Sequence, residues 1–215
     1  MLIDLHSHTW PLSDDSLLDP DDLIIRTKEA GIDGICLTEH DFFWDHEKVR
    51  QLAHKHQFLV LPGCEVNTEQ GHMLTFGLTE YRFGMHRVEE LARMVDAVDG
   101  AMIAAHPYRR QMPWQPNDPN DYHRALERAK QNRAYRYVAA LEIENGRGSE
   151  RENEFSRRLA TELEMPGTAG TDSHARKDIA RCATYFEADI RSLEDLIQAL
   201  KAGRFYPVTL QRARA

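Results

Sequence analysis

The sequence predicts an α/β fold in which helices flank a mostly parallel sheet. Short apolar runs rich in β-forming residues alternate with longer, charged segments of helical period, and βα units produce this alternation. With 215 residues, the chain has the usual size of one domain with a substantial core. We therefore expect a single domain over residues 1–215, with the helices outside the strands.

Eight segments have the composition and length of strands, namely residues 2–5, 34–38, 58–62, 73–77, 101–105, 138–144, 168–171 and 182–186. A helix is expected from Asp19 to Ala30, because Pro20 favours a first turn and Gly31 is a typical stop. Similar patterns predict helices over residues 45–56, 87–98, 121–131, 150–164 and 192–202. Residues 109–120 contain three prolines, which predicts a long loop within the domain.

The overall charge is acidic, with 27 Lys and Arg against 35 Asp and Glu, a net charge of -8. Such a chain would repel a long nucleic acid unless bound cations changed the local field. The three cysteines, Cys36, Cys64 and Cys182, form no C-x-x-C pair, which favours a reducing compartment. The first residues do not resemble a signal peptide, and no apolar run is long enough to span a membrane. We expect a cytoplasmic protein without a membrane partner.

Side chains of the metal-ligating type stand where predicted strands end. They are His6, His8, His40, Glu65, His106, Asp172 and His174. In a barrel built from βα units, the C-terminal ends of the strands converge on one mouth. The sequence therefore predicts that these side chains meet.

The spacing supports a metal site. In an extended chain, residues i and i+2 point to the same side, so His6 with His8 and Asp172 with His174 can each present two ligands. A single H-x-H pair is just as typical of structural histidines, but two such pairs together with ligands at other strand ends favour metal binding. Imidazole and carboxylate groups without thiolate favour Zn, Mn or Fe(II). Strand alternation should turn Cys64 into the wall.

The remaining histidines lie in helical or polar segments without a partner at ligand spacing. We expect them on the surface: His46, His54, His56, His86 and His123. Asp41, which follows His40, has two open interpretations. It either orients a ligand imidazole or caps the next helix.

Several motifs in fixed order, HSHT, Ser13-Asp14, TEHD, GCE, GHML, AAHP and GTDSH, resemble the PHP (polymerase and histidinol phosphatase) domain over residues 4–174. The resemblance implies a distorted (β/α)7 barrel with a trinuclear metal centre and phosphoesterase activity. It also implies which residues hold the metals. These are His6, His8, Glu65 and Asp172 for one ion, Glu65, His72 and His106 for a second, and Asp14, His40 and His174 for the third.

Two of these positions depart from the pattern. Asp14 stands one residue further from HSHT than in some members of the family, so Asp15 could take its place. His72 lies near the start of a predicted strand and not at its end. Its assignment therefore depends on the family pattern alone.

Two or three divalent ions close together generate hydroxide near neutral pH and stabilise attacking and leaving oxygens. We therefore expect hydrolysis of a small phosphomonoester or a nucleotide-sized phosphate ester by a metal-bridging hydroxide, with Glu65, Asp172 and His174 in the catalytic centre. Candidates for binding the phosphate oxygens are Arg109, Arg110 and Arg176, although such arginines are also typical of solvated loops. The alternatives are a nuclease that trims nucleic-acid ends and a metal-binding module without catalysis.

Overall fold

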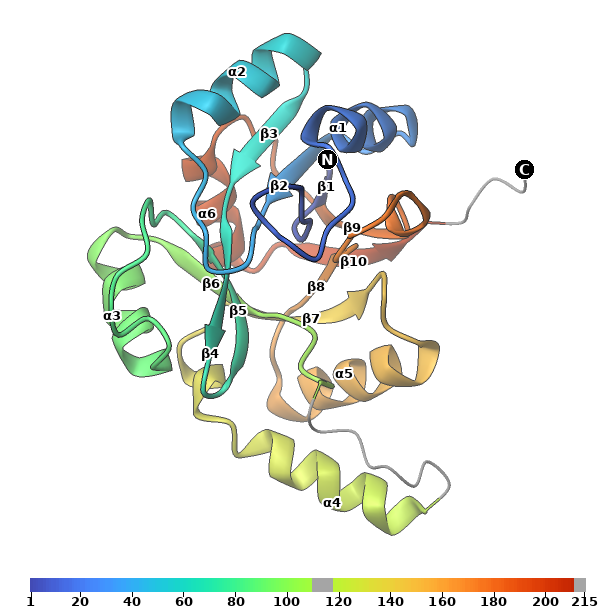
Figure 1. Ribbon diagram of the computed structural model, residues 1–215. Coiled ribbons are helices and arrows are strands. Elements are labelled where there is room, and N and C mark those ends of the chain that lie inside the picture. The colour runs from blue at the N-terminus through green and yellow to red at the C-terminus, as the bar shows by residue number, and fades with distance from the viewer. Residues whose placement is uncertain (110–117, 211–215) are drawn as a thin grey trace.

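The computed structural model describes residues 1–109 and 118–210, and their strands form two five-stranded sheets (Figure 1). The order is β10-β9-β1-β2-β3 in the first sheet and β4-β5-β6-β7-β8 in the second. The strands are β1 (Leu2–Asp4), β2 (Gly34–Leu37), β3 (Leu59–Pro62), β4 (Cys64–Thr68), β5 (Gly71–Phe76), β6 (Ala101–Ala104), β7 (Ala140–Asn145), β8 (Gly167–Gly170), β9 (Cys182–Phe186) and β10 (Phe205–Thr209).

The strand directions are mixed. Strands β1, β2 and β3 run parallel, as do β6, β7 and β8, whereas β9, β10, β4 and β5 pair antiparallel with their neighbours. Six of the ten described strands have a parallel neighbour, but parallel and antiparallel strand pairs are equally many, so the expectation of mostly parallel strands is met only in part. The two sheets are not closed into a barrel, so the expected (β/α)7 barrel is not confirmed and the fold is mixed α/β.

The sheets approach each other where the candidate ligands lie. Isolated parallel bridges join Ser7 to Ser173 and His40 to Glu65. Backbone hydrogen bonds from Asp172 N to His6 O (2.8 Å) and from Glu65 N to Glu39 O (3.0 Å) reinforce these bridges. These contacts hold strand ends of both sheets close together around the candidate ligands.

The helices surround the sheets (Figure 1). They are α1 (Pro20–Glu29), α2 (His46–His56), α3 (Val88–Ala97), α4 (Pro119–Lys130), α5 (Glu150–Leu163) and α6 (Leu193–Ala202), with short 3-10 helices η1 (Arg133–Arg136) and η2 (Arg176–Asp178). The predicted helices are confirmed to within about two residues at each end. Asp19 caps the start of α1, and Gly31, with a φ of +81°, lies just beyond the end of this helix, as the sequence indicated.

No helix among the described residues is long and apolar enough to cross a membrane.

Two strands were not predicted. Strand β4 has polar residues on one face because Glu65 and Asn67 point toward the site and its rim, which obscures the apolar signal of a strand. Strand β10 contains Pro207, which is tolerated at the edge of a sheet. Side chains of both sheets form an apolar core that includes Ile3, Phe76 and Phe186.

Candidate metal centre

Glu65 lies at the centre of the candidate ligands. Its carboxylate is fully buried, and Oε1 lies 2.8 Å from both His72 Nδ1 and His106 Nε2. Strand β5 runs antiparallel to β6, so its first residues lie beside the end of β6, from which His106 follows. The position of His72 at a strand start thus brings it to the site, as the resemblance implied.

The second oxygen of Glu65 is surrounded by imidazole nitrogens. Oε2 lies 2.9 Å from His40 Nδ1, 3.2 Å from His8 Nε2 and 3.3 Å from His6 Nε2. None of these close approaches is a hydrogen bond. Oε2 and His40 Nδ1 are therefore both buried without a hydrogen-bond partner among the described residues. Ligand atoms bound to one ion at about 2.0–2.2 Å stand about 3 Å apart. The spacing therefore fits a shared cation.

His6, His8 and Asp172 form a second part of the same cluster. His6 Nε2 lies 3.0 Å from His8 Nε2, and Asp172 Oδ1 lies 3.7 and 3.5 Å from these two nitrogens. Asp172 Oδ1 is also buried without a hydrogen-bond partner in the described chain. Asp172 and His106 have positive φ angles of 51° and 28°, which is uncommon for residues other than glycine and concentrates at functional sites.

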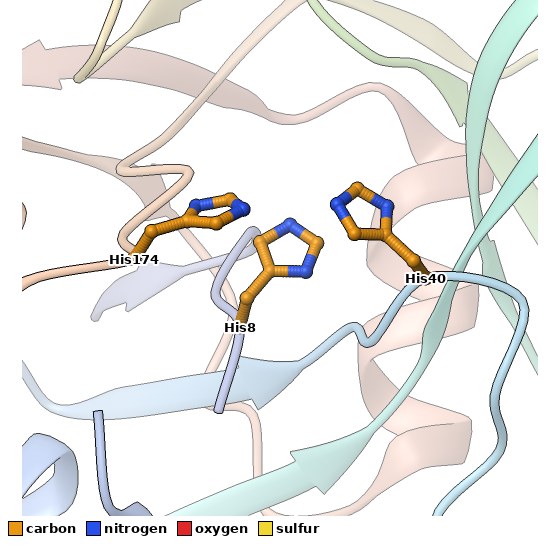
Figure 2. A group of neighbouring side chains, drawn as sticks. All are labelled: His8, His40 and His174. Atoms are coloured by element: carbon orange, nitrogen blue, oxygen red, sulfur yellow. The ribbon is translucent and has the colours of Figure 1, made fainter. Parts of the chain in front are cut away.

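A third group of ligands lies beside His8. The imidazole of His8 stacks on His40 and contacts His174, with ring centroids 4.2 and 4.3 Å apart (Figure 2). Asp15 Oδ2 lies 3.0 Å from His174 Nε2 and 3.5 Å from His40 Nε2. Asp14 is exposed, and no described contact joins its side chain to the cluster. Of the two aspartates that the sequence left open, Asp15 therefore lies beside these histidines and Asp14 does not.

The arginines are distributed differently from the expectation. Arg109 donates to Asp172 Oδ2 at 2.7 Å, at the cluster as predicted. Arg147, which the sequence did not single out, has Nη1 2.8 Å from His174 Nδ1 and 3.8 Å from Asp172 Oδ1. Arg176, the third candidate, is exposed and pairs with Asp22 at 2.8 Å, away from the cluster. Arg110 lies outside the described residues.

Glu142 is a buried carboxylate that the sequence reasoning missed. Its Oε1 lies 2.9 Å from His6 Nδ1, and its Oε2 accepts from His106 N at 2.8 Å and Asn145 Nδ2 at 3.0 Å. An acid inside the apolar run VAALEIE was the available signal. A bulge between Glu142 and Glu144 breaks the alternation that would place both on one face.

Ser13 and Glu39 hold His8 from the other side. Glu39 is fully buried and accepts hydrogen bonds from Ser13 Oγ (2.5 Å), Trp44 Nε1 (2.9 Å) and Thr9 N (2.8 Å). Ser13 Oγ lies 3.1 Å from His8 Nδ1. Because the hydroxyl gives its one proton to the carboxylate, it accepts from His8 Nδ1–H.

The tautomers of His6 and His8 follow from these contacts. Each Nδ1 carries its proton toward an acceptor, Glu142 for His6 and Ser13 for His8. The two Nε2 atoms then face each other at 3.0 Å, and their lone pairs repel unless a proton or a metal ion lies between them. Orientation of metal-bound imidazoles by such partners is common, so the donor set fits a metal ion.

Other sequence expectations have clear outcomes. Asp41 accepts from Asn67 N and Nδ2, at 2.9 and 2.8 Å, so neither of its two interpretations is correct. The helix cap is Asp45. Cys64 is buried in the apolar wall, as alternation predicted. The five histidines assigned to the surface lie outside the cluster, although His46 and His56 are partly buried.

The charges of the cluster suit metal binding. Burial opposes ionisation of Glu65 and Asp172, but the imidazole of His6 outweighs it and holds both carboxyl pKa values below their ordinary range. Burial lowers the pKa of His106, and burial together with His8 lowers that of His174. The carboxylates are therefore ionised at neutral pH, and these two imidazoles keep their lone pairs.

Comparison with known families identifies the chain. The PHP domain model matches residues 4–153, and a model described as PHP-associated matches residues 150–205. The first match covers more than half of the chain and contains most of the cluster. The chain therefore belongs to the PHP family.

Individual relatives are distant. Uncharacterized protein MJ1587 of Methanocaldococcus jannaschii is 27% identical over 117 residues, which are 50% of this chain and 68% of that protein. A two-domain protein of Bacteroides vulgatus, containing a predicted PHP-like metal-dependent phosphoesterase, superposes with a TM-score of 0.62 at 22% identity over 97% of this chain and 64% of that one. An amidohydrolase of Chromobacterium violaceum superposes with a TM-score of 0.63 at 15% identity, over 98% and 99% of the two chains. These structures share the fold.

Proposed function

We propose that the protein is a metal-dependent hydrolase that cleaves a small phosphomonoester or a nucleotide-sized phosphate ester. The observation that carries this proposal is the Glu65 carboxylate, whose two oxygens contact imidazoles of three ligand groups. The proposed ligands are His6, His8, Asp15, His40, Glu65, His72, His106, Asp172 and His174. Two or three Zn, Mn or Fe ions held there would supply hydroxide near neutral pH and polarise the phosphoryl group.

Arg109 and Arg147 would bind the phosphate oxygens. Both contact the carboxylate of Asp172, at 2.7 and 3.8 Å. The two guanidinium groups therefore lie on the same side of the cluster as Asp172. If Asp172 held a cation, the cation would share its charge, and the two guanidinium groups could turn toward an anion. Arginine matches the geometry of phosphate oxygens and stays charged at any physiological pH.

His174 leaves Arg147 available for this role. Its Nδ1 lies 2.9 Å from the backbone oxygen of Asp172, and a proton donated there leaves Nε2 for the metal. With Nδ1 protonated, its 2.8 Å contact with Arg147 Nη1 joins two hydrogen-bond donors. Arg147 would therefore readily give up this contact for a phosphate oxygen.

We also propose a cytoplasmic location, since the three cysteines are free and buried.

An assay on aryl phosphates tests the proposal. Protein loaded with Zn, Mn or Fe(II) should hydrolyse para-nitrophenyl phosphate faster than bis(para-nitrophenyl) phosphate, and a chelator should abolish the activity. A preference for the diester would support a nuclease. Metal binding without turnover of either ester would support a non-catalytic module.

A further inference from the structure

A cavity of about 340 Å³ opens beside the metal centre, at the end formed by His72 and His106. Its walls come from the start of β5, the end of β6 and the turn before η1. The lining residues include Gln70, Met73, Ala104, Pro107, Asn132 and Tyr135. Pockets for small ligands have volumes of about 300–1,000 Å³, so this cavity suits a single small group next to the reacting phosphate.

The described lining of the cavity contains a basic residue and no acidic one. Arg109 lines it, whereas no Asp or Glu is among its described lining residues. The carboxylate of Glu65 lies behind His72 and His106, fully buried and in contact with both. A cation in the cavity would therefore have no carboxylate of its own to pair with.

The polar side chain of Asn132 is already engaged. Its Nδ2 donates to Gln70 O at 2.8 Å, and its Oδ1 accepts from Ala134 N at 2.9 Å. The described hydrogen bonds leave the side-chain amide of Gln70 free. Met73, Ala104 and Pro107 add apolar surface, so the walls offer packing area and few fixed acceptors.

We propose that this cavity receives the alcohol portion of the phosphate ester and selects one that is uncharged or anionic. This inference rests on the proposed phosphoesterase function and extends it to a substrate class. An ammonium group would lose its hydration there and would face Arg109 and the bound divalent ions. Phosphate esters of amino alcohols should therefore be poor substrates, and those of neutral or acidic alcohols good ones.

Three phenyl phosphates test the selection. Their para substituents are hydroxymethyl, carboxymethyl and aminomethyl, so they differ in charge while their leaving phenols remain similar. The metal-loaded protein should cleave the aminomethyl ester with a kcat/KM at least about tenfold below that of the hydroxymethyl ester. Equal values, or a preference for the cation, would overturn the inference and leave the proposed function intact. If none of the three is cleaved, the proposed function fails and the inference fails with it.

A charge variant connects the selection to the cavity. Gln70→Glu adds a carboxylate to the lining and should raise the ratio of kcat/KM for the aminomethyl ester to that for the hydroxymethyl ester by about fivefold or more. Gln131→Glu makes the same change at an exposed residue at the end of α4, outside the lining, and should leave the ratio as it is. Equal ratios in both variants would show that the cavity does not hold the alcohol portion.

A binding measurement provides a readout that does not depend on turnover. The free para-hydroxymethyl phenol, added to protein labelled at its methionine methyl groups, should shift the NMR signal of Met73. Met94 lies in a different hollow beside α3 and should not respond. A shift at Met94 with none at Met73 would place the alcohol elsewhere and overturn the inference.

Discussion

Ser13 Oγ lies 2.5 Å from Glu39 Oε2, and this contact determines how His8 can bind a metal. The carboxylate takes the only proton of the hydroxyl, so Ser13 accepts from Nδ1–H of His8 and leaves Nε2 with its lone pair. The Ser13→Ala variant should therefore weaken zinc binding about 10- to 100-fold, as is typical when a partner of a ligand is lost. Competition with a chromogenic chelator measures the affinity. Ser156→Ala, which removes another buried hydroxyl in α5, is the matched control.

The charge of Glu39 can be tested separately. Glu39→Gln keeps the shape of the side chain but leaves one acceptor oxygen for the donors Ser13, Thr9 and Trp44. Nitrogen NMR of the histidines should show that His8 no longer favours the Nδ1–H tautomer in the Ser13→Ala variant, with a smaller change in Glu39→Gln. If Ser13→Ala retains both the tautomer and the zinc affinity, Ser13 does not position His8.

The protein should bind more than one metal ion per chain. The cluster offers more ligands than one four- to six-coordinate ion can use. Elemental analysis after supplementation with Zn or Mn should give more than one equivalent of transition metal. One equivalent or less would contradict a multinuclear centre.

Metal uptake should release protons. Burial opposes the charged form of His6, but Glu142, Glu65 and Asp172 raise its pKa well above the ordinary value, and Asp172 and Glu65 likewise raise that of His8. In the metal-free protein His6, and to a lesser degree His8, therefore hold a second proton more readily than an ordinary imidazole, and a metal must displace it. The apparent affinity should therefore fall as the pH falls. Calorimetry in two buffers of different ionisation enthalpy should detect the protons, and identical heats would contradict the protonated state.

Asp15 and Asp14 should have different effects on the third metal. Asp15→Ala removes the carboxylate between His40 and His174 and should lower metal content and reduce turnover at least about tenfold. Asp14→Ala changes an exposed residue and should behave like the unmodified protein. Metal analysis and kinetics of the two variants decide between the positions, and a larger effect of Asp14→Ala would restore the first assignment.

The convergence of the ligands was predictable because it depends on where strands end. His6, His40 and His106 follow strands whose ends lie together in any βα arrangement, and the i, i+2 spacing indicated that His6 pairs with His8. His72 required the direction of β5, which the local sequence does not determine. For the same reason the antiparallel pairing of β5 and β9 was not predicted, since both have the composition of ordinary strands.

Contacts that depend on a turn were less predictable. The loop after HSHT directs Ser13 inward to Glu39 and so presents Asp15, not Asp14, to the histidines. Arg176 was expected at the mouth from its distance to His174 in sequence, but Asp22 on α1 holds it at the surface. Arg147 comes two residues after the end of β7, and nothing in the sequence indicated that it lies at the cluster. Such partners come from distant elements and leave no local pattern.

Site histidines and surface histidines should differ in their response to substitution. His6→Ala or Asp172→Ala removes a fully buried ligand and should eliminate about one metal equivalent and nearly all turnover. His54→Ala changes an exposed residue of α2 and should retain both. Metal content and kcat/KM measured together provide the test. If His54→Ala is as damaging as His6→Ala, the separation between the cluster and the surface is wrong.

Substrate size and salt dependence distinguish a phosphatase from a nuclease. The net charge is -8, and the described cations at the cluster, Arg109 and Arg147, can neutralise only one phosphate group. A protein that follows a long strand through many phosphate contacts loses affinity steeply as salt rises, whereas metal coordination of a single phosphate responds weakly. We therefore expect kcat/KM for a mononucleotide or a small sugar phosphate to exceed that for a long single strand, and to change less than about twofold between low and physiological ionic strength. Kinetics on both substrates at two salt concentrations measure this. A strong preference for the polymer that disappears with added salt would indicate a nuclease instead.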